Sequence, residues 1–288
     1  MSIVNKNNKD RLFRLLFGDE RYKTNTLELY NAINGTSYTN PDELEFNTID
    51  DFIYMGMKND TSFIIRDDLS IFEQQSTYNP NMPVRGLMYL GKVYDSYIKS
   101  HKLNIYGKTQ ITLPVPQYVV FYNGTEANYR DKDVFELKLS DAFSGKTGCV
   151  EVTAIVYNVN YGHNDRLMKA CRALSEYAAF VNEIRNNRSK GMELKDAINL
   201  AVNVCLERNI LKDILLKHKA EVEGMIFTEY DELETIENTK VEGMEYLIDV
   251  YNWLRHIGRS DDAAKLMSGD KDLRRIFFDE YEKSLKKE

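Results

Sequence analysis

The acidic and amide side chains between residues 60 and 75 are the ones whose types and spacing suggest chemistry. Asp60 stands at the start of one strand-like run, and Glu73 and Gln75 stand near the end of the next. Alternate residues of a strand point to the same side of a sheet, so Glu73 and Gln75 are predicted to share a face. Carboxylates buried in strands are costly unless they are paired or bound to a metal. The acids between residues 60 and 75 are therefore candidates for a metal-binding site.

A hairpin that turns at Asp67 and Asp68 would bring the three side chains together. The runs TSFII and SIFEQQ are typical of strands, and the charged residues between them suit a tight turn. Counting outward from the turn roughly matches Arg66 to Asp60 on one arm with Leu69 to Gln75 on the other, which predicts that Asp60 and Glu73 lie close together, with Gln75 adjacent. Two carboxylates with a backbone carbonyl and water form the hard-oxygen site that Mg²⁺ prefers. A metal there suits phosphodiester cleavage, with the third side chain orienting the attacking water.

Other metal or nucleophile sites find little support in the sequence. The four histidines show no metal-ligand spacing, and the cysteines form no CxxC pair, so neither zinc nor a disulfide framework is indicated. Each cysteine is predicted to be a buried thiol that packs as a small hydrophobe. These cysteines are Cys149, Cys171 and Cys205.

Hydrophobic periodicity predicts an α/β core followed by helices. Only helices are expected after residue 166, and the core is therefore assigned to residues 1–160 and a helical region to 161–288. The 149–159 strand, rich in β-branched residues, is expected to be fully buried. The other expected elements are a helix over 10–33 broken at Gly18 and Asp19, short strands within 52–75, a helix over 86–98 and a strand over 117–124.

The chain of 288 residues has no apolar run near the ~18 residues that a membrane span needs. Its N-terminus lacks a secretory hydrophobic region, so a cytoplasmic location and no membrane partner are expected. The net charge of −7 argues against a uniformly basic surface. Between Arg85 and Lys108, however, Asp95 is the one acid among five basic residues, which is compatible with a local DNA-binding face.

At the hairpin the chain resembles the PD-(D/E)xK nuclease superfamily, whose signature is an acid at the start of one strand and Glu-x-Lys on the next. In its recombination-promoting nuclease branch, whose members are also described as transposases, the Lys is commonly Gln, as in Glu73-Gln74-Gln75 here. The resemblance covers most of residues 1–230 and stops before about Val241. Similar segments include KNDTSF, FEQQSTYNPNMPVRG, PQYVVFYNG, LKLSDAF and VNYGHNDRLM.

This resemblance implies a restriction-endonuclease-like α/β core, with a mixed central sheet flanked by helices, and an α-helical C-terminal extension. It implies a DNA endonuclease that uses Mg²⁺ or Mn²⁺ and is associated with recombination or mobile elements. Asp60 and Glu73 would be the metal ligands, and Gln75 would orient the water. DNA is the expected partner, and a homodimer is compatible with this interpretation.

Basic and aromatic residues just after the hairpin are candidate contacts to the DNA backbone. Arg85 and Tyr89 lie one helical turn apart, and Lys92, Lys99 and Lys102 follow on or just after the same helix. Packing of Tyr89 and a surface role for Arg85 are the competing interpretations.

A second hypothesis is a catalytically weak or inactive nuclease-fold protein that binds DNA or a partner. Gln75 can donate and accept hydrogen bonds and so position water, but it adds no charge beside a phosphate. The net acidity and the long helical tail also favour this alternative.

Overall fold

The computed structural model describes residues 11–46, 61–126, 129, 131–144, 146, 148–268 and 270–285. The chain divides into two compact units, Met1–Glu229 and Tyr230–Glu288. This division differs from the predicted boundary at residue 160, because helices beyond that residue pack into the first unit. Tyr177, on one of these helices, lies against Phe13 with the ring centroids 6.0 Å apart.

The first unit is built on a six-stranded mixed sheet with the order β1-β2-β3-β4-β6-β5. The central strands β3, β4 and β6 are parallel to one another, and the remaining pairs are antiparallel. This confirms an α/β core with a mixed sheet flanked by helices. The strands are β1 (Leu44–Phe46), β2 (Thr61–Ile65), β3 (Asp68–Gln75), β4 (Val115–Tyr122), β5 (Val134–Lys138) and β6 (Thr153–Asn158).

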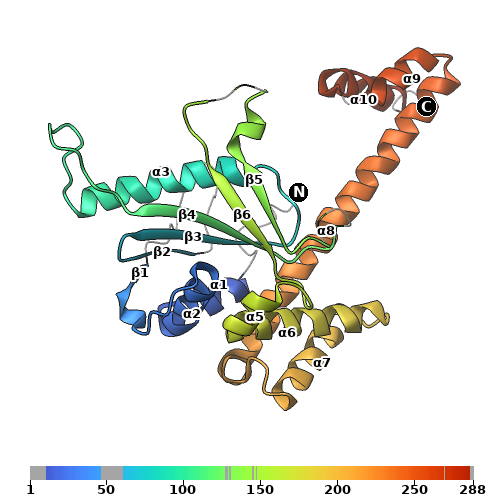
Figure 1. Ribbon diagram of the computed structural model, residues 1–288. Helices are drawn as coiled ribbons and strands as arrows, with labels where there is room; N and C mark the ends of the chain where they lie inside the picture. The colour runs from blue at the N-terminus through green and yellow to red at the C-terminus, as the bar shows by residue number, and fades with distance from the viewer. Residues whose placement is uncertain are drawn as a thin grey trace. The chain divides into compact units, whose positions relative to one another are not determined.

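Helices cover both faces of the sheet (Figure 1). One face carries α3 (Met82–Ser100), and the other carries the N-terminal helices together with α5 and α6. The other helices of the first unit are α1 (Arg11–Phe17), α2 (Lys23–Asn34), α5 (Asp165–Ala170), α6 (Arg172–Ser189), α7 (Leu194–Glu207) and the first part of α8 (Lys212–His256), with short 3₁₀ turns η2 (Glu20–Tyr22), η3 (Pro41–Glu43) and η4 (Leu139–Ala142).

The N-terminal helical segment is interrupted at Gly18 and Asp19, as predicted. The Asp19 side chain accepts a hydrogen bond from the Arg21 backbone N–H at 2.9 Å and so caps η2. Aspartate at such a position satisfies a backbone donor that a new helical turn leaves unpaired. Gly35 then ends α2 in the left-handed conformation at φ 66°, which glycine adopts without steric cost.

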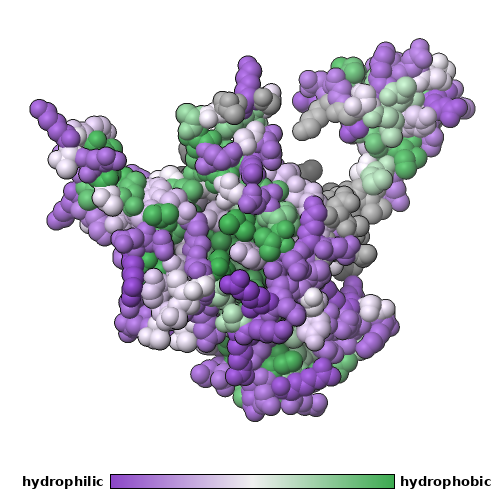
Figure 2. Space-filling view, viewed as in Figure 1, coloured by the Kyte–Doolittle hydropathy of each residue, from purple (hydrophilic) through white to green (hydrophobic). Residues whose placement is uncertain are grey.

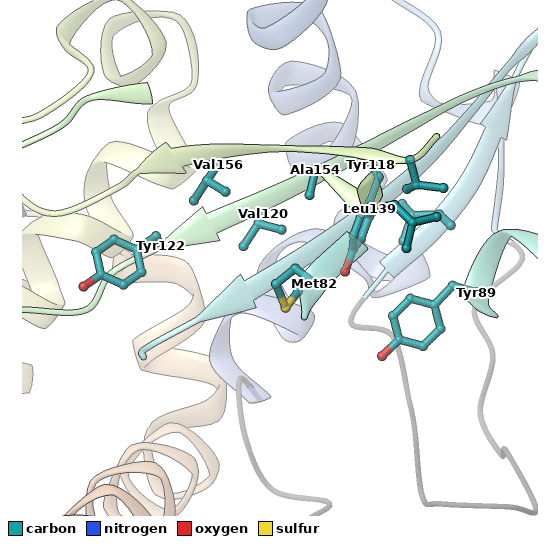
Figure 3. Close-up of a cluster of buried hydrophobic side chains, with 10 residues drawn as sticks. Met82, Tyr89, Tyr118, Val120, Tyr122, Leu139, Ala154 and Val156 are labelled. Atoms are coloured by element: carbon teal, nitrogen blue, oxygen red, sulfur yellow. The ribbon is translucent and has the colours of Figure 1, made fainter. Parts of the chain in front are cut away.

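Strand β3 lies in the interior of the sheet, and its two faces pack against different layers. Phe72 points to the α1 side, where its ring lies 5.1 Å from Phe63 and 5.4 Å from Phe121. Ile71, on the opposite face, joins the core beneath α3. Figure 3 shows Met82 and Tyr89 of α3 with Tyr118, Val120 and Tyr122 of β4 and Val156 of β6 in that core.

The second unit has its own small core. It contains the second part of α8 with α9 (Ser260–Leu266) and α10 (Lys271–Leu285). Earlier in α8, within the first unit, the regular helix is interrupted at His218, which has φ −128° and ψ 24°. The core residues of the second unit are Val250, Leu254, Ala263, Leu266 and Phe277.

Several strand predictions need correction. The expected buried strand over 149–159 is the shorter β6, whose side chains alternate between buried and half-buried, so one of its faces is covered less completely than the other. Cys149 lies before β6 and is exposed, whereas Cys171 and Cys205 are buried as predicted. The predicted run FIYMGM (52–57) lies outside the described residues.

Among the described helices, none is long and apolar enough to cross a membrane.

Candidate active site

Glu73 is a buried carboxylate in the middle layer of the first unit. Its strand pairs with β2 on one side and with β4 on the other, where Glu73 stands opposite Val120. The residue is 1% exposed. A charged group withdrawn from water in this way requires a counter-charge or a metal, since burial of an isolated ion costs several kcal/mol or more.

Arg85, from the first turns of α3, supplies that counter-charge. Its Nη2 donates to Glu73 Oε2 at 2.8 Å, and the arginine side chain is 23% exposed. The Tyr89 hydroxyl accepts from Arg85 Nη2 at 2.9 Å and from Arg85 Nε at 3.2 Å. These contacts join strand and helix in one polar network. Hydrogen bonds between ionised groups are the stronger ones in proteins.

The electrostatics of this network fix the charge states of its members. Burial by itself lowers the pKa of Arg85, but the Glu73 carboxylate together with the Tyr89 and Tyr118 hydroxyls outweighs burial, so the pKa is raised overall. Burial raises the pKa of Tyr89, and the negative charge of Glu73 adds to that increase. At neutral pH the arginine is therefore cationic and the tyrosine is a neutral phenol.

The close approach of α3 to the sheet allows Arg85 to reach Glu73. Helix α3 begins with Met82 and Pro83, both buried, and proline suits the first turn of a helix because its missing N–H would be unpaired there. Gly86 then faces Tyr118 of β4 so closely that a Cβ atom at residue 86 would lie 2.6 Å from the tyrosine ring. A glycine is therefore required where helix and strand come together.

Gln75 ends β3 on the same side of the sheet as Glu73, as the alternation of a strand predicts. It is half-buried and lines a small recess formed with residues of β4, β5, β6 and the loop before α3. In the β3–β4 register Gln75 stands opposite Tyr122. The amide is thus placed at the carboxyl ends of parallel strands, the edge at which open α/β sheets commonly bind ligands.

A second carboxylate at this edge was not identified from the sequence. Glu126 accepts from the Tyr78 backbone N–H at 2.8 Å and from the Tyr122 hydroxyl. Burial raises the pKa of Tyr122, and the hydrogen bond to Glu126 raises it further. The segment NGTE directly after the strand QYVVFY carries the signal, since an acid that follows a strand end lies at the same edge as the strand's last residues.

Asp60, the other predicted metal ligand, lies outside the described residues. Its chain neighbour Thr61 is the first residue of β2 and pairs with Phe72, the chain neighbour of Glu73. The hairpin forms as predicted, but its register is shifted by two residues from the one counted, because Leu69 pairs with Ile64 and not with Arg66. The turn comprises Arg66 and Asp67, and Asp68 already belongs to β3. Arg66 adopts φ 54° at this turn.

The predicted nucleic-acid contacts occupy different environments along α3. Tyr89 is fully buried and belongs to the core, so it presents no surface to a nucleic acid in this structure. Arg85 is engaged with Glu73, while Lys92 is half-buried on the helix. Lys99 pairs with Asp95 at 2.7 Å on an exposed face, and Lys102 follows the helix at φ 53°.

The donor chemistry at the end of β3 fits Mg²⁺ or Mn²⁺. Glu73 and Gln75 present carboxylate and amide oxygens from one face, and hard divalent cations bind such atoms. Within the described ranges no three His, Cys, Asp or Glu side chains are grouped closely enough to hold an ion. A complete site would therefore need Asp60 in addition to Glu73.

Comparison of the chain with protein-family models, with curated proteins and with solved structures finds no match in any of the three.

Proposed function

We propose that the chain is a divalent-metal-dependent DNA endonuclease that acts in recombination or on mobile elements. The observation that supports this most directly is the buried Glu73 carboxylate on an interior strand, with Gln75 on the same face and at the strand end. A carboxylate in that position destabilises a sheet unless it is paired with a cation or binds a metal ion. Glu73 lies on β3, which pairs with β2, and Asp60 directly precedes β2 in the sequence.

In this proposal Asp60 and Glu73 hold the ion, which supplies Lewis-acid activation of the phosphate and of water when bound. Gln75 orients the attacking water through its amide, which can donate and accept hydrogen bonds. Arg85 holds the Glu73 carboxylate in a fixed orientation through its hydrogen bond to Oε2. Positioning by rigid strand residues is effective because geometry alone contributes greatly to such reactions.

The charge distribution near α3 supports DNA as the substrate. No acidic residue occurs from position 96 to position 125, a stretch that contains Lys99, Lys102 and Lys108. The loop between α3 and β4, residues 101–114, also exposes Tyr106, of which 93% is accessible. Figures 1 and 2 show this loop extending from the end of α3, with hydrophilic and apolar residues side by side. Lysines beside an exposed aromatic ring suit phosphates and unstacked bases.

The test is cleavage of supercoiled plasmid in Mg²⁺ or Mn²⁺, with and without chelator. We expect nicked and linear products that disappear with chelator, and we expect Asp60→Asn and Glu73→Gln each to remove them. Glu136→Gln is the matched control, because Glu136 is an exposed glutamate on β5 of the same sheet. Full cleavage by Glu73→Gln would refute the assignment of the site.

The second candidate function is a nuclease-fold protein that binds DNA or a partner without turnover. It is favoured by the Arg85–Glu73 ion pair, which already neutralises the carboxylate, and by the lack of charge on Gln75. DNA binding that persists in chelator, together with no cleavage at any Mn²⁺ concentration, would support this alternative over the first.

A further inference from the structure

Arg85 supplies a positive charge to the site, which neither of the strand residues Glu73 and Gln75 can supply. It is cationic, its guanidinium contacts the buried carboxylate directly, and it comes from the helix that covers this face of the sheet. Its Nε and Nη2 donate to Tyr89 and Glu73, while among the described residues Nη1 contacts only the thioether sulfur of Met82, at 3.4 Å. A thioether is a weak acceptor, so this edge retains capacity for a stronger one.

The partial exposure of Arg85 means that this edge is not sealed in the core. The side chain is 23% exposed, against 1% for Glu73. A guanidinium has five N–H donors in a fixed fork and binds carboxylates and phosphates with the same geometry. Arg85 can therefore hold Glu73 with Nη2 and bind a second anion with Nη1.

We propose that Arg85 is a fourth functional residue of the site, beside Asp60, Glu73 and Gln75. It competes with the divalent ion for Glu73, and it supplies to the substrate phosphate the fixed positive charge that Gln75 lacks. This inference rests on the proposed function. A carboxylate has about four lone-pair positions, so the guanidinium and the ion can both be accommodated, at the cost of repulsion between them.

The two parts of this role predict opposite effects when the charge is removed. Without Arg85 the Glu73 carboxylate binds a divalent cation more tightly, because a neighbouring like charge is gone. The phosphate loses a preorganised cation, so cleavage slows. A scaffolding role for Arg85 would lower both ion affinity and rate, and a purely inhibitory role would raise both.

The experiment compares Arg85→Met with Arg85→Lys in the full-length protein. Mn²⁺ affinity is measured by calorimetry without DNA, and the cleavage rate is measured in single turnovers at saturating Mn²⁺. We expect Arg85→Met to bind Mn²⁺ roughly 10-fold more tightly and to cleave about 100- to 1,000-fold more slowly. Arg85→Lys keeps a point charge and should fall between Arg85→Met and the parent in both measurements.

The matched control is Arg66→Met. Arg66 also pairs with a glutamate, Glu43, at 2.9 Å, but this pair is at the surface beside the turn of the hairpin. Both measurements should be unchanged in this variant.

Each outcome discriminates. Arg85→Met with weaker Mn²⁺ binding and slower cleavage would overturn the inference while leaving the proposed function intact. If Arg85→Met does not fold, Arg85→Lys is the test. In Arg85→Lys, a Mn²⁺ affinity equal to that of the parent together with a cleavage rate lowered about 100-fold would show that the shape of the guanidinium and not its charge is required, and would overturn the inference. A parent that neither binds Mn²⁺ nor cleaves DNA would overturn the proposed function, and this inference with it.

Discussion

Replacing Gly86 by alanine should destabilise the first unit, although the same change in a helix is usually favourable. A Cβ atom at residue 86 would lie 2.6 Å from two ring atoms of Tyr118 and 3.3 Å from a third. Carbon atoms pack best at about 3.5–4.0 Å, so the helix or the ring must move by roughly 1 Å. Tyr118 is 3% exposed and has little room to turn away.

The magnitude follows from two opposing contributions. Alanine lowers the conformational entropy of the unfolded chain, which stabilises a helix interior by roughly 0.5–1 kcal/mol relative to glycine. Overpacking a close-packed core by one methyl group costs about 1–3 kcal/mol. The difference spans about 0–2.5 kcal/mol, so the free energy of unfolding should fall by about 1 kcal/mol, which lowers the melting temperature of a unit of this size by roughly 2–4 °C.

The same helix offers a matched control, Gly91. A Cβ atom there meets nothing within 4 Å, and the position is exposed. Gly91→Ala should raise the free energy of unfolding by about 0.5–1 kcal/mol, so the two alanine variants should change stability in opposite directions. Thermal and urea unfolding of both proteins measure this difference.

Relief of the crowding provides a second check. Tyr118→Val removes the ring, so Gly86→Ala should cost much less in that background than in the parent, as coupled neighbours do. A Gly86→Ala protein as stable as Gly91→Ala would refute the close approach of α3 to β4. It would also remove the reason why Arg85 lies beside Glu73.

Three further predictions concern the site, the DNA-binding surface and the thiols. Gln75→Ala should slow cleavage about 10- to 1,000-fold while Mn²⁺ affinity stays near that of the parent, since the amide is assigned to the water. A combined charge reversal on α3 and just after it should weaken DNA binding at ~100 mM salt and reduce its salt dependence in a filter-binding assay, with Lys195→Glu on α7 as control. The reversed residues are Lys92, Lys99 and Lys102. In native protein at pH 8 a thiol reagent should label Cys149 alone, because burial raises the pKa of Cys171 to about 12 and of Cys205 to about 11; labelling of all three before denaturant is added would contradict the burial.

Local signals in the sequence were sufficient for the hairpin and for the break in the N-terminal helix. Charged residues between two β-rich runs specify a turn, and an acid after glycine specifies a new helical turn. The shared face of Glu73 and Gln75 followed from strand alternation alone. These features depend on residues near one another in the chain, which is why they were predictable.

The remaining features depend on contacts between distant segments. Strand β5 alternates between exposed and half-buried residues and forms through its partner β6, which comes later in the chain. The sequence placed the start of the helix near Arg85 and Gly86, whereas α3 begins at Met82, and Arg85 was expected to contact DNA and not Glu73. Its ion pair with Glu73 requires the exact distance between helix and sheet, which periodicity does not give. The boundary between the two units depends on which helices pack into the first unit, and not on where the strands end and the helices begin.

The strand order has a consequence for the growing polypeptide. Strand β6 lies between β4 and β5, although it is synthesised after both. A nascent chain that ends before Thr153 therefore presents β4 with one edge unpaired, and the residues from Tyr118 to Tyr122 on that edge are all buried in the finished protein. Long apolar edges of this kind pair readily with other chains. During translation the first unit therefore remains vulnerable to aggregation until β6 has emerged and closed the gap between β4 and β5.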